Sequence, residues 1–163
     1  MDPGSVGLAT TGPVASSPAP SPLSFTLTAG TDNMTGAGTD DTFTATTATL
    51  QPADTIDGAG GTDTFTFTNT SAAALPAASF KSIEVFNIIA TSNLNSTDVS
   101  GLAGMTKFNA DRATATITAT NAGAGVQYGI LGDNATLSPG SFNFGYAGGA
   151  MVATLNLQNG VKS

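Results

Sequence analysis

The feature that most constrains the fold is a repeat, because the segment that begins at Asp32 matches the segment that begins at Asp54 after an ungapped shift of 22 residues. Identical or similar residues coincide at eight positions: Asp32 with Asp54, Met34 with Ile56, Gly36 with Gly58, Ala37 with Ala59, Gly38 with Gly60, Asp41 with Asp63, Phe43 with Phe65 and Thr44 with Thr66. A period of roughly 20 residues with two strands and two Gly-rich turns is typical of a β-solenoid. A β-sandwich has the same strand density, but it does not explain why turn and strand recur together.

Hydrophobic and polar residues alternate with a period of two, as in Phe25-Thr26-Leu27-Thr28 and Phe65-Thr66-Phe67-Thr68, whereas helical spacing is nearly absent. Further strands are expected at 83–89, 113–120, 142–146 and 151–157, and one helical turn within 70–80 is left open. The candidate core residues include Phe25, Phe43, Phe65, Phe67, Val85, Phe86 and Ile88, of which adjacent ones such as Val85 and Phe86 cannot both point inward. The sequence therefore predicts an all-β, right-handed parallel β-solenoid.

The first 22 residues contain five prolines and lack the basic and apolar regions of a secretory signal. We expect a disordered linker or leader at 1–22 and a solenoid domain at 23–163. No repeat is registered after Ala122, and the strand-like ending suggests part of a longer protein. No apolar run is long enough for a transmembrane helix.

Composition excludes several classes of function. The chain has no His, Cys or Trp, which removes His bases, thiolate nucleophiles, zinc-thiolate sites and disulfides. Four basic residues against eleven acidic ones give a net charge of -7, so nucleic acid and anionic membranes are poor partners. Glu84 is the only Glu and is expected to point outward from its strand, so no paired-carboxylate enzyme is predicted.

Acidic residues concentrate in the repeat: six Asp lie between positions 32 and 63, with no Lys or Arg. Carboxylates at equivalent places on stacked coils would lie about 5 Å apart and repel by about 3 kcal/mol at an effective dielectric of 20. Ca²⁺ accepts such carboxylates together with turn carbonyls. The alternative is that these are ordinary Asp-Gly turns with solvated carboxylates.

The second copy, Gly58-Ala59-Gly60-Gly61-Thr62-Asp63-Thr64-Phe65, resembles the repeats-in-toxin nonapeptide G-G-x-G-x-D-x-U-x, with Ala59 in place of the second Gly. The first copy, Gly36-Ala37-Gly38-Thr39-Asp40-Asp41-Thr42-Phe43, keeps the Asp and the Phe but has Thr39 where a Gly belongs. Asp40 has no counterpart in the second copy and is expected to face water.

Residues 23–122 resemble the solenoid portion of the calcium-dependent surface-layer proteins of alphaproteobacteria, such as that of Caulobacter, most strongly over 28–89. The resemblance implies a structural protein exported by type I secretion, which assembles with itself at the bacterial cell surface; a cell-surface polysaccharide is a second candidate partner. It also implies Ca²⁺ in the coils at 28–70. The implied ligands are Asp32, Asp41, Asp54, Asp57 and Asp63, with the turn residues Gly36, Gly58 and Gly60.

Two alternatives remain open for function. An adhesin is one, and an ice-binding solenoid is the other, because Thr-x-Thr runs occur at 42–49, 64–70 and 114–120. The simpler interpretation of these runs is the β-propensity of Thr. Asp98, Asp111 and Asp133 lie outside the cluster and are expected to be turn or cap residues.

Overall fold

The computed structural model describes residues 18–132, 141–146 and 154–158, which form strands and no helix. The strands are β1 (Ser24–Thr26), β2 (Asn33–Thr35), β3 (Thr42–Thr46), β4 (Thr55–Asp57), β5 (Thr64–Asn69), β6 (Ser79–Lys81), β7 (Val85–Ala90), β8 (Leu94–Asp98), β9 (Lys107–Asp111), β10 (Ile117–Ala122), β11 (Gln127–Leu131), β12 (Phe142–Tyr146) and β13 (Thr154–Gln158). Residues 18–22 precede β1 as exposed chain without a strand, and the rest of the expected linker lies outside the described residues.

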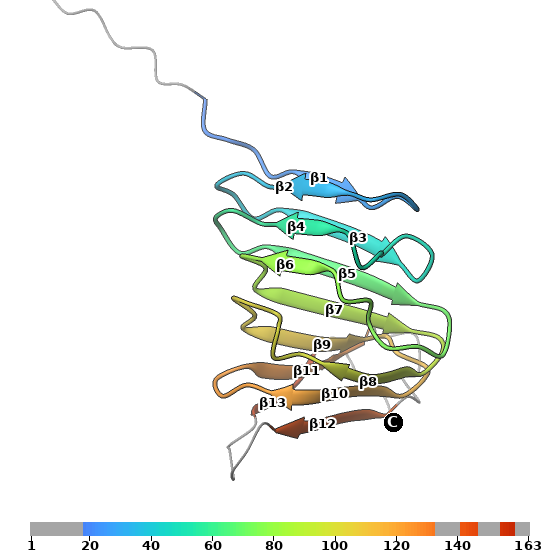
Figure 1. Ribbon diagram of the computed structural model, residues 1–163. Coiled ribbons are helices and arrows are strands. Elements are labelled where there is room, and N and C mark those ends of the chain that lie inside the picture. Colours follow the sequence, from blue (N-terminus) through green and yellow to red (C-terminus); the bar gives the residue numbers. More distant parts are fainter. Residues whose placement is uncertain (1–17, 133–140, 147–153, 159–163) are drawn as a thin grey trace, which may run out of the picture.

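All strand pairs are parallel and join the strands into three sheets. The odd-numbered strands form one seven-stranded sheet in chain order, whereas β2, β4 and β6 form a second sheet and β8, β10 and β12 a third. Figure 1 shows the coils stacked along one axis, with the two short sheets in front of the long one. The parallel β-solenoid expected from the sequence is therefore confirmed.

The 22-residue period of the sequence equals the number of residues between paired positions on neighbouring coils, from β2 to β4 and from β3 to β5. Met34 pairs with Ile56 between β2 and β4, and Phe43 pairs with Phe65 between β3 and β5. Later coils differ in length, since Gln127 pairs with Lys107 on one side and with Thr154 on the other. Unequal coils explain why no repeat is visible after Ala122, although the solenoid continues there.

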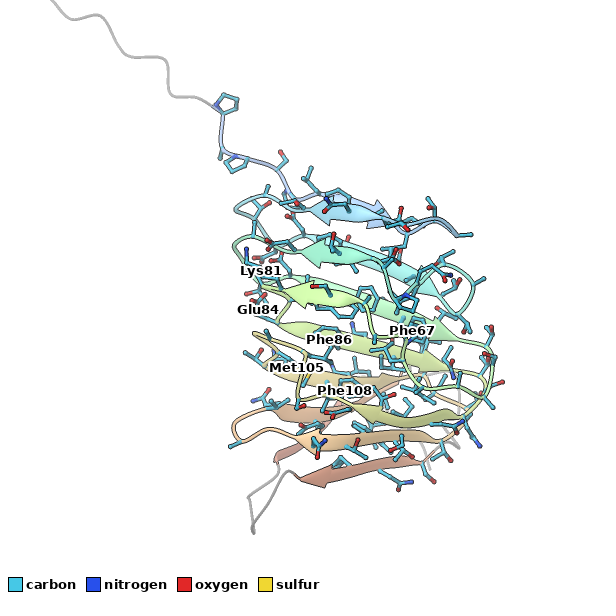
Figure 2. All side chains as sticks on the ribbon, in the orientation of Figure 1. Phe67, Lys81, Glu84, Phe86, Met105 and Phe108 are labelled. Atoms are coloured by element: carbon cyan, nitrogen blue, oxygen red, sulfur yellow. The ribbon has the colours of Figure 1, made fainter. Side chains whose placement is uncertain are left out.

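A column of aromatic side chains runs through the core because equivalent residues of successive coils stack on one another. Its members, paired in register from β1 to β11, are Phe25, Phe43, Phe65, Phe86, Phe108 and Tyr128. Phe80 of β6 closes the core from the opposite sheet, with its ring centroid 4.8 Å from that of Phe65. Figure 2 shows Phe67, Phe86 and Phe108 on successive strands of the long sheet.

The predicted core is correct except at two positions. Phe43, Phe65, Phe67, Phe86 and Ile88 are buried. Val85 is half-buried because β7 alternates and Phe86 takes the inward position. Phe25 is half-buried because it lies in the first strand, and its ring stacks on that of Phe43 at a centroid distance of 4.8 Å.

Strand boundaries shift where turns intervene. The strand expected at 83–89 begins at Val85, after Ser82 with a positive φ of 50°. The strand expected at 113–120 begins only at Ile117, after Arg112 with a φ of 46°. The strand at 142–146 has the expected bounds; of the strand expected at 151–157, residues 151–153 lie outside the described residues and 154–157 belong to β13.

The front face of the solenoid is interrupted at 70–78, before β6, and no helical turn forms within 70–80. Here β6 and β8 do not pair, and the isolated parallel bridge between Ala73 and Leu94 is the pairing recorded across the break. A hollow of about 230 Å³ marks this break, with Pro76, Phe80 and Leu102 in its lining. The long sheet runs past the break without interruption.

Candidate functional site

Three acidic residues stack in register just before the strands of the long sheet. Asp41, Asp63 and Glu84 immediately precede the paired residues Thr42, Thr64 and Val85, respectively. Asp41 and Asp63 are buried, and Glu84 is half-buried. Asp41 and Asp63 lie in register on neighbouring coils, as expected. Glu84 is a third residue of this acidic column, and the sequence did not predict it.

Each carboxylate in this acidic column accepts a hydrogen bond from the backbone N–H of the equivalent residue one coil earlier. Leu23 N donates to Asp41 Oδ1 at 2.7 Å, and Asp41 N donates to Asp63 Oδ1 at 2.7 Å. Asp63 N donates to Glu84 Oε2 at 2.8 Å. Hydrogen bonds to an ionised acceptor are stronger than neutral ones, so these contacts stabilise charges that would otherwise repel.

A second, shorter acidic column follows the same rule beside the front sheet. Asp32 N donates to Asp54 Oδ1 at 2.9 Å, and the other oxygen of the buried Asp54 accepts from Gln51 N at 2.7 Å. Asp32 uses its own carboxylate within its turn, where Thr28 N donates to it at 2.7 Å. Both oxygens of Asp54 are thereby occupied by N–H donors.

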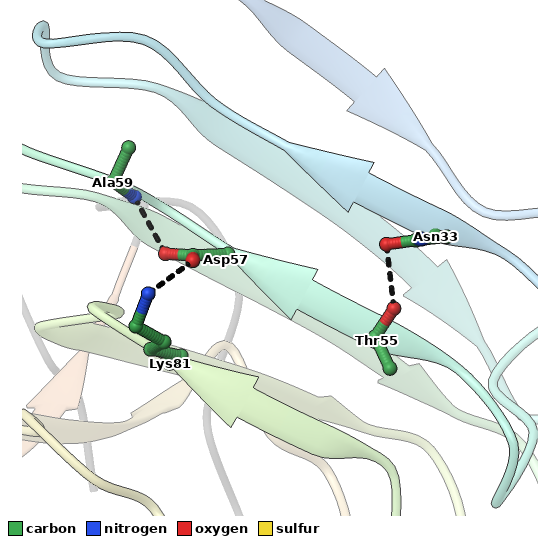
Figure 3. Close-up of polar contacts among 5 residues, drawn as sticks. All are labelled: Asn33, Thr55, Asp57, Ala59 and Lys81. Atoms are coloured by element: carbon green, nitrogen blue, oxygen red, sulfur yellow. Dashed lines mark hydrogen bonds and ion pairs between the residues drawn. The ribbon is translucent and has the colours of Figure 1, made fainter.

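Asp57 differs from the other predicted ligands because it binds a lysine. Lys81 Nζ lies 2.7 Å from Asp57 Oδ2, and Ala59 N donates to Oδ1 at 2.9 Å (Figure 3). The two residues are register partners between β4 and β6. No basic residue lies within 32–63, but the next coil places one against this carboxylate.

Asp63 has the one carboxylate of its column with an unpartnered buried oxygen, Oδ2. In the coil before, Asp41 Oδ2 accepts from Ala37 N at 2.5 Å, and Thr39 Oγ1 donates to Oδ1 at 3.0 Å. The equivalent donor near Asp63 is Ala59 N, and it is bonded to Asp57 instead. Ala59 has a φ of 68°, the left-handed conformation for which the nonapeptide carries Gly at this position.

Gly58 brings an oxygen of the backbone close to the free oxygen of Asp63. A Cβ on Gly58 would overlap both the Ser82 carbonyl oxygen and Asp63 Oδ2, so the two oxygens converge on one point. Gly36 is the equivalent residue one coil earlier, where a Cβ would overlap Asp41 Oδ2 and meet Gly58 O at 2.5 Å. Gly60 has no such constraint, because its nearest neighbour would lie 3.9 Å from a Cβ.

The pKa values of the two column aspartates move in opposite directions. Hydrogen bonds from the backbone of Ala37 and Leu23, and then from Thr39, hold the pKa of Asp41 below its ordinary value of 3.8. Burial raises the pKa of Asp63, and the nearby carboxylates of Glu84, Asp41 and Asp40 raise it further. The pKa of Asp57 is lowered by Lys81 and by the backbone of Ala59.

Of the remaining aspartates, Asp40 lies in the turn before β3, whereas Asp98 and Asp111 are the last residues of β8 and β9 and not turn residues as expected. Asp40 is exposed, as expected, and accepts from Thr62 N at 2.8 Å. Asp98 accepts from the backbone and hydroxyl of Ser100, and the hydroxyl is the main cause of its lowered pKa. Asp111 pairs with Arg112 at 2.8 Å, and Asp133 lies outside the described residues.

Comparison with protein-family models, curated sequences and solved structures finds no match to this chain. Within the described residues, no group of three or more acidic side chains is close enough together to hold a metal ion. The same part of the chain contains no helix capable of spanning a membrane.

Two oxygens that could ligate a hard cation lie close together at Asp63, namely its free carboxylate oxygen and the Ser82 carbonyl oxygen. Ca²⁺ takes about six to eight carboxylate, carbonyl and water oxygens, so most of its ligands here would have to be water. Asp41 and Asp54 fit less well, because N–H donors occupy both oxygens of each carboxylate. Asp32 and Asp57 are likewise committed, to Thr28 and to Lys81.

Sequence reasoning missed Glu84, Lys81 and Ser82 as parts of this site. Shifting the second copy onward by 21 to 24 residues, as the pairs Thr64–Val85 and Asp57–Lys81 require, would have aligned Glu84 with Asp63. This alignment is hard to see in the sequence, because both the residue type, Asp to Glu, and the length of the coil change between Asp63 and Glu84.

We predict that Gly58→Ala destabilises the protein by about 1–3 kcal/mol, the cost of forcing extra atoms into an occupied space. The matched change Gly60→Ala should lie within about 0.5 kcal/mol of wild type, as surface substitutions usually do. Urea unfolding followed by circular dichroism measures both. Equal stability of the two variants would contradict the overlap at Gly58.

A second prediction concerns the same substitution at two equivalent aspartates in the absence of metal. Asp41→Asn should lower the melting temperature, because an amide NH₂ would face an N–H donor. Asp63→Asn should raise it, because the amide can donate to the Ser82 carbonyl and the unpaired charge is removed. Differential scanning calorimetry in EDTA at neutral pH checks both changes.

The pH dependence follows from the pKa directions. The stabilisation from Asp41 is present above the unfolded pKa of 3.8 and is lost as pH falls through the lower folded value. The protonated Asp63 stabilises the fold below 3.8, and this contribution is lost as pH rises through the raised folded value. The advantage of Asp63→Asn should therefore shrink on acidification toward 3.8, and an advantage that grew would be inconsistent with a raised pKa.

Proposed function

We propose that this chain is a structural protein of the bacterial cell surface whose solenoid is ordered by Ca²⁺ and which assembles with copies of itself. The observation that carries the proposal is the buried, unpartnered Asp63 Oδ2 beside the Ser82 carbonyl oxygen. An uncompensated buried carboxylate oxygen is costly, and a bound cation would remove that cost.

The protein's own residues would hold the cation between two coils. Asp63 would contribute its free oxygen, and the Ser82 carbonyl would contribute a second from the following coil. Gly58 leaves the space that both oxygens occupy. When bound, Ca²⁺ supplies positive charge between the coils, so that binding free energy becomes folding free energy.

Repulsion within the acidic columns explains why calcium binding would favour the folded form. Without the cation, burial and the nearby carboxylates of Glu84 and Asp41 disfavour the charged form of Asp63, so the fold would be less stable in a calcium-poor cytoplasm. External calcium then stabilises the folded form by mass action after export. Export by type I secretion and an extracellular location are parts of this proposal that rest on the sequence resemblance.

A structural role, rather than catalysis, agrees with how the acids are used. The column carboxylates accept hydrogen bonds from backbone N–H groups of neighbouring coils and so join strands. Catalytic carboxylate pairs must instead face a substrate across a cleft. A polysaccharide of the cell surface remains a candidate anchor for such a structural protein.

The proposal predicts that Ca²⁺ raises the melting temperature of wild type and of Asp41→Asn, but not of Asp63→Asn. Asp63→Asn removes the free carboxylate oxygen, whereas Asp41 is already occupied by N–H donors. Calorimetry in EDTA and in millimolar Ca²⁺, with Mg²⁺ as the control ion, makes the measurement. A wild-type melting temperature that does not respond to Ca²⁺ would remove the calcium part of the proposal.

Ice binding is the second candidate, and the alignment of threonines on the long sheet favours it. Three threonines of β3 pair with three of β5, namely Thr42 with Thr64, Thr44 with Thr66 and Thr46 with Thr68. Ser24 and Thr26 extend the rows onto β1. The rows end at β7, where Val85, Asn87 and Ile89 take these positions.

If these rows bind ice, the protein should show thermal hysteresis that Thr66→Tyr abolishes, because a ring would lift the flat face away from the crystal. The matched control is Thr55→Tyr, at an exposed position of β4 on the opposite sheet. Nanolitre osmometry measures the effect. Absence of hysteresis and of ice shaping in wild type would leave these threonines with the role of β-sheet formers.

A further inference from the structure

The outer face of the long sheet carries no charge over β1, β3, β5 and β7. Side chains on these strands alternate between the core and the outer face, and the outward ones are exposed or half-buried. They are Ser24, Thr26, Thr42, Thr44, Thr46, Thr64, Thr66, Thr68, Val85, Asn87 and Ile89. We call this surface the neutral face. The whole chain has a net charge of -7, so this is a surface on which two copies can meet without contact between like charges.

The neutral face consists of three rows of side chains that run along the solenoid axis. On β5, Thr66 lies in the middle row, with Thr64 and Thr68 in the two outer rows. On β7 the same three places are taken by Val85, Asn87 and Ile89. A hollow of about 300 Å³ opens on this face, and Thr68 and Ile89 contribute to its lining. The face therefore offers an uncharged, partly apolar recess that side chains of another molecule can fill.

The two edges of the neutral face differ in charge. The turns before β3, β5 and β7 carry the acidic column together with the exposed Asp40. No charged residue occurs in the segments that follow these strands, at 47–53, 70–78 and 91–93. Asp54, the first acidic residue after β3, is buried and precedes β4 of the front sheet. One edge of the neutral face is therefore acidic and the other is uncharged.

We propose that the neutral face binds the neutral face of a second copy of this chain, with the two long sheets packed against each other. A two-fold axis parallel to the solenoid axis would place the acidic edge of each copy beside the uncharged edge of the other. A two-fold axis along the strands would instead bring the two acidic edges together, which like-charge repulsion disfavours. Sheets that pack in this aligned way lie about 10 Å apart.

This symmetry decides which side chains meet. The middle row lies on the axis, so Thr66 of one copy faces Thr66 of the other. The outer rows exchange, so Thr64 faces Thr68 and Val85 faces Ile89. The half-buried apolar side chains of β7 thereby meet beside the hollow. The contact is isologous and closes at a dimer.

The first charged residues of the outer face lie on β9 and fit the same symmetry. Lys107 is exposed and Asp111 is half-buried, and Asn109 lies midway between them in the middle row. The two-fold axis therefore sets each Lys107 opposite an Asp111 of the other copy, which has the opposite charge. Asp111 also pairs with Arg112 of its own chain.

This inference rests on the proposed self-association and deepens it by naming the surface. Asp63 is buried and Ser82 lies in the turn between β6 and β7, so neither belongs to the neutral face. Calcium ordering and face-to-face contact can therefore fail separately.

The test places a charge on the two-fold axis of the full chain. Thr66→Lys and Thr66→Asp each bring like charges together in a homodimer, whereas a mixture of the two variants brings opposite charges together. The matched controls are Thr55→Lys and Thr55→Asp, at an exposed position of β4 on the opposite sheet. Circular dichroism and melting temperature establish that each variant is folded. The same pair of substitutions at the exposed Thr44, in the same row, replaces any Thr66 variant that does not fold.

Sedimentation velocity in Ca²⁺, at concentrations up to millimolar protein, measures association. Wild type and the Thr55 variants should form dimers. The dimer dissociation constant of each Thr66 variant alone should rise at least about tenfold, because like charges at an interface cost several kcal/mol. An equimolar mixture of Thr66→Lys and Thr66→Asp should restore dimers.

A second mixture tests the orientation of the two copies. Thr64→Lys mixed with Thr68→Asp should associate more tightly than Thr64→Lys mixed with Thr64→Asp, because the outer rows exchange across the axis. The reverse order would place the two acidic edges together and would contradict the proposed symmetry.

Three results would overturn the inference as a whole. These are a wild type that is monomeric at every concentration, Thr66 variants that associate as wild type does, and a mixture of Thr66 variants that associates no better than either alone. The second result would indicate self-association through another surface. A monomeric wild type with thermal hysteresis would assign the threonines of the neutral face to ice. Dimers of a wild type whose melting temperature ignores Ca²⁺ would support the neutral face and remove the calcium proposal.

Discussion

Register pairing between coils is the constraint from which the rest of this structure follows. Hydrogen bonds join each strand to its equivalent one coil away, so every side chain lies against its own counterpart. This arrangement favours rows of like residues, as in the aromatic column from Phe25 to Tyr128 and in the hydrogen bond from Asn109 to Asn87 at 2.8 Å. It disfavours rows of like charge.

The acidic columns show how this cost is met. The carboxylates of Asp41, Asp54, Asp63 and Glu84 each accept a hydrogen bond from the backbone N–H of the equivalent residue one coil earlier, which pairs a negative charge with a backbone donor. Lys81 supplies a side-chain cation for Asp57. Asp63 is where this arrangement is incomplete, since its own turn donor is directed to Asp57. Asp63 is therefore the aspartate at which we propose a cation.

The sequence predicts the fold class well because period, turn residues and strand alternation are local and repeat without a gap over the first coils. It also places Asp41 over Asp63 and Asp32 over Asp54, since the register equals the repeat. It does not predict the donors of the carboxylates, because a backbone N–H leaves no trace in residue types. Glu84 and Lys81 were missed because coils beyond the second change length.

The break in the front face has a mechanical consequence. Hydrogen bonds between coils lie along the solenoid axis, because the strands run across it. Tension on the two ends is therefore borne by an unbroken ladder at the back, but at the level of Ala73 the described front carries it through the isolated bridge to Leu94 and the hydrogen bond from Leu75 N to Thr97 Oγ1. Under tension the front coils would separate at this point, and the solenoid would bend about the continuous long sheet, which would act as a hinge.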